Sequence, residues 1–374
     1  MAGIYLHIPF CRQACHYCNF HFATSLLQKP EMVEAMGLEL SSRKQELEGE
    51  LIETIYFGGG TPSLLSVDEL NQLLNAIREH YTISPDAEVT LEVNPDDIEE
   101  ELLKSWKQAG INRLSIGIQS FFEEDLEWMH RAHKARQAME GLRAAAWYFD
   151  NITVDLIYGS PGLSHQKWEE NVRTVLELGI PHISCYALTV EEKTPLAKMI
   201  RESRMENVDP EKQSEQFLLL MKWMEMAGFE HYEISNFAKP GYRSRHNSSY
   251  WGSAPGQAKK YIGIGPSAHS FNGKQRSWNI SNNAIYIRAT REGNTSRETE
   301  TLDATQELNE YIMTALRTME GIRLNVLPAE EQQRVIQLAE KYINSGLMTR
   351  SGDQLQLTKE GKLLADGIAA DLFR

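Results

Sequence analysis

Short apolar runs alternate with longer amphipathic segments through the first two-thirds of the chain. Runs rich in β-branched and aromatic residues predict strands at residues 4–8, 54–57, 88–93, 113–118, 153–157, 182–188 and 231–235. Apolar residues at helical spacing predict helices at residues 29–48, 66–80, 99–108, 135–147, 165–178 and 210–226. This alternation predicts an α/β fold in which helices cover a parallel sheet, either an open sheet or a barrel.

The pattern changes twice beyond residue 235. Residues 236–296 mix Gly, Asn, Ser and aromatic residues without a regular period, which predicts a loop-rich cap. Helical spacing returns at 303–318 and 329–345, and a short hairpin pattern and a last helix follow, an arrangement that resembles a winged helix. We therefore expect three parts, residues 1–235, 236–296 and 297–374.

Polar and glycine residues follow the predicted strands at the points where they end. These residues are the glycine run 58–60 with Thr61, then Glu92, Gln119, Asp155 and the turn 159–162. Ligands of parallel α/β proteins lie at the carboxyl ends of the strands, whether the sheet is open or closed. The sequence therefore predicts one binding site at this end of the sheet.

Three of the four cysteines, Cys11, Cys15 and Cys18, lie within eight residues directly after the first predicted strand. Thiolates gathered in one loop can hold a soft metal, and iron–sulfur clusters are typically held in this way. Three thiolates on a cluster of four irons leave one iron free to bind another molecule.

A zinc site with three cysteines and one histidine is the structural alternative, with His16 or His21 as the nitrogen ligand. Closed zinc sites are usually built from two ligand pairs separated by a longer loop, and no second pair of that kind follows here. The fourth cysteine, Cys185, lies in an apolar run and is expected to be buried in a strand.

Composition excludes some classes of function. The 374-residue chain has 41% hydrophobic and 24% charged residues and a formal charge of −14, so we expect a globular protein that does not bind nucleic acid backbones. The N-terminus has no secretory signal pattern, and no apolar run is long enough for a membrane span. We therefore expect a cytoplasmic protein, where reduced thiols remain available to a metal.

The cysteine spacing, the glycine run and the strand-end polar residues together resemble the radical S-adenosylmethionine superfamily, and within it the oxygen-independent coproporphyrinogen III dehydrogenase-like group. The resemblance covers nearly the full chain and implies a partial (β/α) barrel with a small, mainly helical C-terminal domain. It also implies a 4Fe-4S cluster on Cys11, Cys15 and Cys18, whose open iron binds S-adenosylmethionine. The residues that would contact S-adenosylmethionine are Tyr5, Tyr17, Gly59, Gly60, Thr61, Glu92, Gln119, Arg131 and Asp155.

The segment from His246 to Trp251 fits the HNxxYW pattern of the heme-chaperone branch of this group. In that branch the resemblance implies heme as a third bound group and a heme-acceptor protein as partner, with a membrane-associated hemoprotein as one expectation; it also allows a homodimer. His246 is the candidate heme ligand, because a histidine can ligate heme iron and neighbouring rings can pack on the macrocycle. His269, in a glycine-rich segment, is a second candidate porphyrin contact, although a tight turn explains that segment equally well.

Two functions from different classes follow from the resemblance. A heme chaperone is favoured over a coproporphyrinogen III dehydrogenase, because Phe20 stands where the dehydrogenases have a further cysteine and because their N-terminal segment before the cluster loop is much longer. A radical enzyme that acts on an unrelated substrate is a third interpretation. Whether S-adenosylmethionine is cleaved is left open by the sequence.

Overall fold

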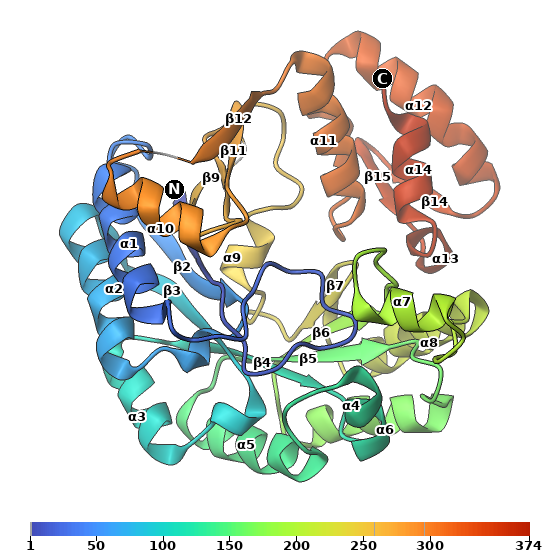
Figure 1. Cartoon of the computed structure of the whole chain (residues 1–374). Helices are drawn as coiled ribbons and strands as arrows, with labels where there is room; N and C mark the ends of the chain where they lie inside the picture. Colours follow the sequence, from blue (N-terminus) through green and yellow to red (C-terminus); the bar gives the residue numbers. More distant parts are fainter. Residues whose placement is uncertain (1, 258, 295) are drawn as a thin grey trace.

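The computed structural model describes residues 2–257, 259–294 and 296–374. Its main sheet, within these residues, has twelve strands in the order β12-β11-β10-β9-β1-β2-β3-β4-β5-β6-β8-β7, and the edge strand β7 is Glu230–Glu233. The neighbours from β1 to β6 all run parallel, with bounds β1 Ala2–Ile8, β2 Ile52–Gly59, β3 Ile83–Val93, β4 Arg113–Gln119, β5 Ile152–Tyr158 and β6 His182–Ala187. The sheet is curved and has two free edges, so the predicted α/β partial barrel is confirmed (Figure 1).

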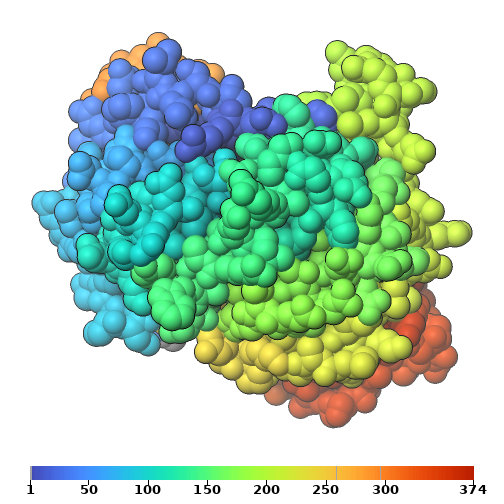
Figure 2. Space-filling view, turned by 90° about the horizontal axis from the view of Figure 1, so that it is seen from below, coloured from blue at the N-terminus to red at the C-terminus, as the bar shows by residue number. Residues whose placement is uncertain are grey.

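Helices cover the outer face of the parallel strands. They are α1 Lys29–Ser42, α2 Val67–His80, α3 Glu100–Ala109, α5 Ala135–Tyr148, α6 His165–Glu177 and α8 Pro210–Met226. Figure 2 shows this outer side, on which the chain passes in order from blue through green to yellow. The predicted helix at 29–48 ends earlier, at Ser42, and two short helices that the pattern did not predict are α4 (Glu123–Met129) and α7 (Pro195–Arg201).

Local sequence explains where α2 begins. The Ser66 hydroxyl accepts a hydrogen bond from the Glu69 amide at 3.2 Å, and the Glu69 carboxylate accepts one from the Ser66 amide at 2.7 Å. This reciprocal capping satisfies two helix-end amides and contributes about 1 kcal/mol. The helix then buries Leu70, Leu73, Leu74 and Ile77 against the sheet. Side chains from all the βα units meet there in one continuous apolar core.

Residues 236–296 contain more regular structure than their composition predicted. The elements that they form are β8 Asn236–Ala238, α9 Arg245–Ser248, β9 Lys260–Ile264, β10 His269–Phe271, β11 Gln275–Asn279 and α10 Asn283–Arg291. Strand β9 pairs in parallel with β1, and β10, β11 and β12 (Arg297–Thr301) continue the sheet as an antiparallel ribbon. Long irregular stretches between these elements agree with the predicted loop-rich cap, but the composition did not predict the strands, because short strands rich in Gly, Ser and Asn carry no clear period.

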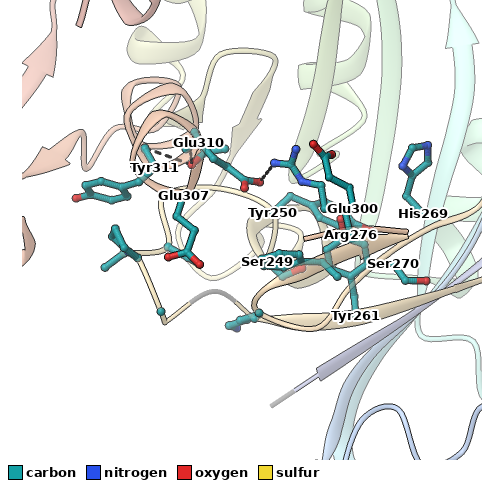
Figure 3. A pocket seen from close by; sticks show the side chains of 18 of the residues that line it. Ser249, Tyr250, Tyr261, His269, Ser270, Arg276, Glu300, Glu307, Glu310 and Tyr311 are labelled. Atoms are coloured by element: carbon teal, nitrogen blue, oxygen red, sulfur yellow. Dashed lines mark hydrogen bonds and ion pairs between the residues drawn. The ribbon is translucent and has the colours of Figure 1, made fainter. Parts of the chain in front are cut away.

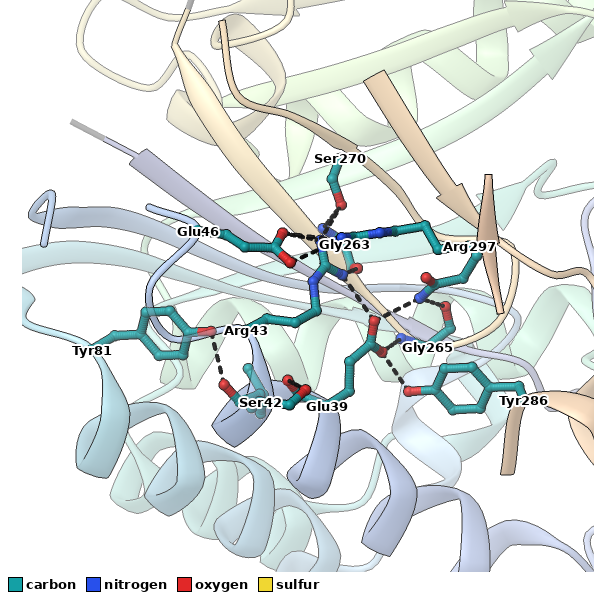
Figure 4. Close-up of polar contacts among 12 residues, drawn as sticks. Glu39, Ser42, Arg43, Glu46, Tyr81, Gly263, Gly265, Ser270, Tyr286 and Arg297 are labelled. Carbon is teal, nitrogen blue, oxygen red and sulfur yellow. Dashed lines mark hydrogen bonds and ion pairs between the residues drawn. The ribbon is translucent and has the colours of Figure 1, made fainter. Parts of the chain in front are cut away.

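A buried arginine holds this ribbon against α1 (Figure 4). Arg43 donates to Glu39 at 2.8 Å, to the carbonyl of Gly263 at 2.7 Å and to the Ser270 hydroxyl at 2.9 Å. Asn279 also donates to Glu39, at 2.8 Å. Because a buried charge is tolerated only when it is paired and hydrogen-bonded, this network fixes the ribbon to the barrel.

The C-terminal residues have their own core. The elements after β12 are α11 Ala304–Leu316, β13 Ile322–Arg323, α12 Ala329–Asn344, β14 Met348–Ser351, β15 Gln354–Leu357, α13 Lys359–Lys362 and α14 Ala365–Leu372. Three short strands pair in the order β13-β15-β14, and apolar side chains such as Ile312, Val335 and Leu355 are buried among the helices. The helices predicted at 303–318 and 329–345 and the terminal hairpin are confirmed. Among the described helices, none combines the length and hydropathy that crossing a membrane requires.

Candidate functional site

A cavity of about 470 Å³ opens at the carboxyl ends of the parallel strands. It is called the strand-end cavity below. The predicted site residues that line it are Cys11, Cys15, Tyr17, Cys18, Gly59, Gly60, Thr61, Glu92, Gln119, Arg131 and Asp155. Tyr5 and His246 are the two predicted site residues that do not line it. Residues that are far apart in the sequence therefore meet in one cavity at the strand ends, where ligands of parallel α/β proteins lie.

The cysteine loop is held over this cavity by backbone hydrogen bonds. The Cys11 amide donates to the carbonyl of Ala23 at 3.0 Å, and the His16 amide donates to the carbonyl of Met129 at 3.1 Å. All three thiols of the loop are unbridged and partly exposed. Burial raises the pKa of Cys11 to about 11, although a hydrogen bond from Thr61 at 3.5 Å opposes this. Thiolates at this place therefore need a positive charge beside them, which a bound metal supplies.

Arg131 brings one such charge into the cavity. Its guanidinium donates to Asn94 Oδ1 and to the carbonyl of Gly117, both at 2.8 Å, and to Cys15 Sγ at 3.6 Å. Its Nε is buried and has no hydrogen-bond partner among the described residues. Arg131 thus does not form the surface pair with Glu127 that its sequence spacing suggests, since Glu127 pairs with Lys134.

Two carboxyl groups face the cavity from neighbouring parts of the sheet. Burial raises the pKa of Glu92 to about 7, and the nearby charge of Asp155 adds to the effect. Tyr56 donates to Glu92 Oε1 at 2.7 Å, and the Gly59 amide donates to Oε2 at 3.2 Å. Burial also raises the pKa of Asp155 to about 6. Buried carboxyls in a cavity are well placed to receive a ligand with positive charge and hydroxyl groups.

Some residues of this site were missed from the sequence. Ser115 lines the cavity and donates to Asp155 at 3.4 Å, and Tyr56 orients Glu92. Side-chain alternation could have found Ser115, because residues 115, 117 and 119 share one face of β4. Gln119 ends that strand with a φ of 66°, a left-handed conformation that is uncommon for a residue with a side chain.

His246 lies elsewhere, inside the barrel, with only 2% of its surface exposed. Its Nδ1 shares a hydrogen bond with the Thr54 hydroxyl at 2.8 Å, and its Nε2 shares one with the Tyr250 hydroxyl at 2.7 Å. Its ring stacks at 4.9 Å on Tyr56, and Tyr5 lies against both rings. In this conformation neither ring nitrogen of His246 is available to an iron atom.

The histidines of the zinc alternative are engaged as well. His16 Nδ1 shares a hydrogen bond with the carbonyl of Trp128 at 3.0 Å, and His21 Nε2 shares one with Asn283 at 2.7 Å. Across the described part of the chain, no three Cys, His, Asp or Glu side chains converge on one metal ion. Cys185 is buried in β6, as expected.

Comparison with known proteins identifies the class. The model of the radical SAM superfamily matches residues 5–190, and the model of the HemN C-terminal domain matches residues 302–364. A solved structure described as coproporphyrinogen III oxidase (HemN) from Escherichia coli, a radical SAM enzyme, superposes with a TM-score of 0.84. It is 21% identical, and the match covers all of this chain and 90% of that one, which shows a shared fold. The fold and the cysteine loop thus define a radical S-adenosylmethionine protein.

Relatives named heme chaperone HemW match almost the whole chain. Those from Mycobacterium tuberculosis and Bacillus subtilis are each 34% identical, over 99% and 98% of this chain and 94% and 98% of their own length. The one from Escherichia coli is 30% identical over 98% of this chain and 96% of its own. This chain belongs to the HemW family of radical S-adenosylmethionine proteins.

The cofactors of the superfamily, a 4Fe-4S cluster and S-adenosylmethionine, fit the residues of the strand-end cavity. Cys11, Cys15 and Cys18 would hold the cluster, because their loop presents three free thiols to the cavity. The unpartnered Nε of Arg131 suits a carboxylate, and Glu92 and Asp155 suit an ammonium group or ribose hydroxyls. When bound, the cluster and S-adenosylmethionine together would supply one-electron chemistry at this end of the sheet.

Proposed function

We propose that this protein is a heme chaperone that binds heme, a 4Fe-4S cluster and S-adenosylmethionine and passes heme to an acceptor protein. The observation that carries the proposal is the agreement over nearly the full length with relatives named heme chaperone HemW. The segment from His246 to Trp251, which fits the pattern of the heme-chaperone branch, adds to it.

A coproporphyrinogen III dehydrogenase is the alternative function, and one position of the site argues against it. Phe20 occupies the place of the additional cysteine of those enzymes, and its side chain lines the strand-end cavity while 67% of it is exposed. The phenyl ring of Phe20 cannot supply the thiol that the dehydrogenase motif has at this position. The likeness to the HemN structure concerns the fold, which hosts more than one function.

The setting of the function is also part of the proposal. We infer a cytoplasmic location, because all four cysteines are free thiols and a reducing compartment preserves them. The acceptor is proposed to be a membrane-associated hemoprotein, and a homodimer is proposed as the resting assembly.

One anaerobic experiment separates the two functions. Cluster-reconstituted protein receives S-adenosylmethionine and a reductant, with heme or coproporphyrinogen III supplied in parallel reactions. The proposal predicts stoichiometric heme binding in the absorption spectrum and no decarboxylated porphyrinogen. Formation of protoporphyrinogen over many turnovers would make the protein an enzyme and overturn the proposal.

A further inference from the structure

A second cavity, of about 390 Å³, lies between the antiparallel ribbon and α11 (Figure 3). We call it the aromatic cleft. One wall is a single face of the ribbon, because its residues alternate along each strand: His269 and Phe271 on β10, Arg276 and Trp278 on β11, and Glu300 on β12. The ring contacts continue this wall, since Tyr261 lies at 6.4 Å from Phe271 and Tyr250 packs edge-on against Tyr261 at 4.8 Å.

The opposite wall is one face of α11. Glu307, Glu310, Tyr311 and Thr314 line the cleft at the spacing of successive helical turns. An ion pair between Arg276 and Glu310 crosses the cleft and joins the two walls (Figure 3). A sheet face and a helix face thus lie opposite each other with a cavity between them, a shape suited to a flat molecule.

His269 is the metal-ligating side chain of this cleft. It is exposed, its ring lies 6.0 Å from that of Trp278, and neither ring nitrogen is hydrogen-bonded to a described residue. Burial and the charge of Arg276 lower its pKa, which favours the neutral imidazole that binds metals. His269 therefore differs from His246, whose two ring nitrogens are both engaged.

We propose that heme, the cargo inferred above, binds in the aromatic cleft with the His269 imidazole as an axial ligand of its iron. The inference rests on the proposed function and assigns a place to its cargo. Tyr261, Phe271 and Trp278 offer apolar ring surface to the macrocycle, and a single imidazole is a common protein ligand of heme iron.

The charges of the cleft orient the cargo. Lys259 and Arg276 are its cations, and both face carboxylates: Lys259 lies 3.6 Å from Glu53, and Arg276 pairs with Glu310. A heme propionate therefore competes with Glu310 for Arg276, while Glu300 and Glu307 repel a propionate. Such competition keeps binding reversible, as a chaperone that releases its cargo requires.

His246 then has a role as a positioning residue. Its Nε2 shares a hydrogen bond with the hydroxyl of Tyr250, and Tyr250 lines the cleft. The ring of His246 stacks on the ring of Tyr56, and the Tyr56 hydroxyl donates to Glu92 in the strand-end cavity. The HNxxYW segment thus lies between the two cavities and fixes one ring of the heme site without touching the iron.

The test is a heme titration of the full-length, cluster-reconstituted protein, followed in the Soret region. His269→Ala is expected to weaken heme binding about tenfold or more and to change the spectrum, since an axial ligand is lost. Added imidazole should restore the spectrum of this variant. The matched control is His165→Ala, because His165 is an exposed histidine paired with Glu215 outside both cavities.

The outcomes separate this inference from the function on which it rests. Wild-type affinity and spectrum in the His269→Ala variant would overturn the site, while heme binding by the wild type would leave the chaperone function standing. No heme binding by the wild type would overturn both. Unchanged cluster iron and circular dichroism in the variant confirm that it is folded.

Discussion

The strand-end cavity and the aromatic cleft are both partly polar, but they differ in the groups that a ligand would meet. The first is lined by thiols, a guanidinium and two half-buried carboxyls whose pKa values are raised by desolvation, to about 7 for Glu92 and about 6 for Asp155. The second is lined by aromatic rings, by an exposed histidine and by charged side chains that include the Arg276–Glu310 ion pair. The first therefore suits a metal cluster and a small polar cofactor, and the second suits a large flat molecule that carries charged groups at its edge.

A row of side-chain contacts connects the two cavities. Glu92, Tyr56, His246 and Tyr250 form a continuous row of contacts from one cavity to the other, through a 2.7 Å hydrogen bond at each end and a ring stack at 4.9 Å between. The segment that marks the family by sequence thus lies between the two proposed ligands. A change in one cavity has a direct physical route to the wall of the other.

Removing one cysteine should have the largest effect, because it changes the strand-end cavity and leaves the aromatic cleft intact. Cys15→Ala is expected to abolish the cluster, because two thiolates cannot hold it, while heme binding in the aromatic cleft remains. The measurement is iron and acid-labile sulfide content together with heme titration. The control is Cys185→Ala, since Cys185 is buried in β6 away from the loop. Full iron content in the Cys15→Ala variant would contradict the assignment.

Cutting the buried arginine network should destabilise the protein, because Arg43 fixes the ribbon that forms one wall of the aromatic cleft. Only 2% of the Arg43 side chain is exposed, and it links Glu39 to the ribbon, so Arg43→Met leaves a buried carboxylate unpaired. The expected loss in the free energy of unfolding is about 3–5 kcal/mol. Denaturant unfolding measures it, and Arg291→Ala, which removes an exposed ion pair, should change stability by less than about 1 kcal/mol. Equal losses in both variants would refute a special role for Arg43.

The raised pKa of Glu92 makes stability depend on pH. Since the folded-state pKa, about 7, lies above the ordinary value of 4.5, the contribution of Glu92 is present below about pH 4.5 and is lost as the pH rises through about 7. Glu92→Gln should remove this fall, which amounts to about 1–3 kcal/mol when the partial exposure of the group is considered. The measurement is the free energy of unfolding from pH 5 to pH 8 for both proteins without ligand. Parallel curves would show that Glu92 titrates at its ordinary pKa.

The smallest expected effect concerns the ion pair between Arg276 and Glu310 in the aromatic cleft. Glu310→Gln frees Arg276 from its partner, so heme affinity should rise about threefold as a propionate gains that guanidinium. The gain should shrink at high salt, because screening weakens an exposed charge pair. Heme titrations at low and high ionic strength measure both effects. A weaker affinity in this variant would mean that the ion pair is needed to hold the cleft walls together.

Much of the strand-end cavity could be predicted from the sequence. Hydrophobic periodicity located β1 to β6, and the rule that ligands lie at strand ends then placed Glu92, Gln119 and Asp155 together with the cysteine loop. Ser115 and Tyr56 were missed because side-chain alternation points to a strand residue only after another residue of the same face, such as Gln119 for Ser115, has been placed in the site. The nature of the cofactors came from the family resemblance and the cysteine motif.

The aromatic cleft could not be predicted in the same way. The strands that form one wall of the cleft are short, and they lie in a segment whose Gly, Asn and Ser content favours loops. Their pairing therefore depends on the tertiary contacts of Arg43. The sequence put His246 first, as the candidate heme ligand, and gave His269 only as a second candidate porphyrin contact. Only the structure shows that the nitrogens of His246 are both engaged, whereas His269 lines a cavity and has neither nitrogen hydrogen-bonded to a described residue.

Simultaneous binding of heme and S-adenosylmethionine tests the account of two separate cavities most directly. Anaerobic, cluster-reconstituted protein would be titrated with heme at zero and at saturating S-adenosylmethionine, with bound S-adenosylmethionine measured at each heme saturation. Separate cavities predict one heme and one S-adenosylmethionine per chain, both bound at once. Displacement of one molecule by the other, in a competitive titration, would place both in the strand-end cavity and contradict the account.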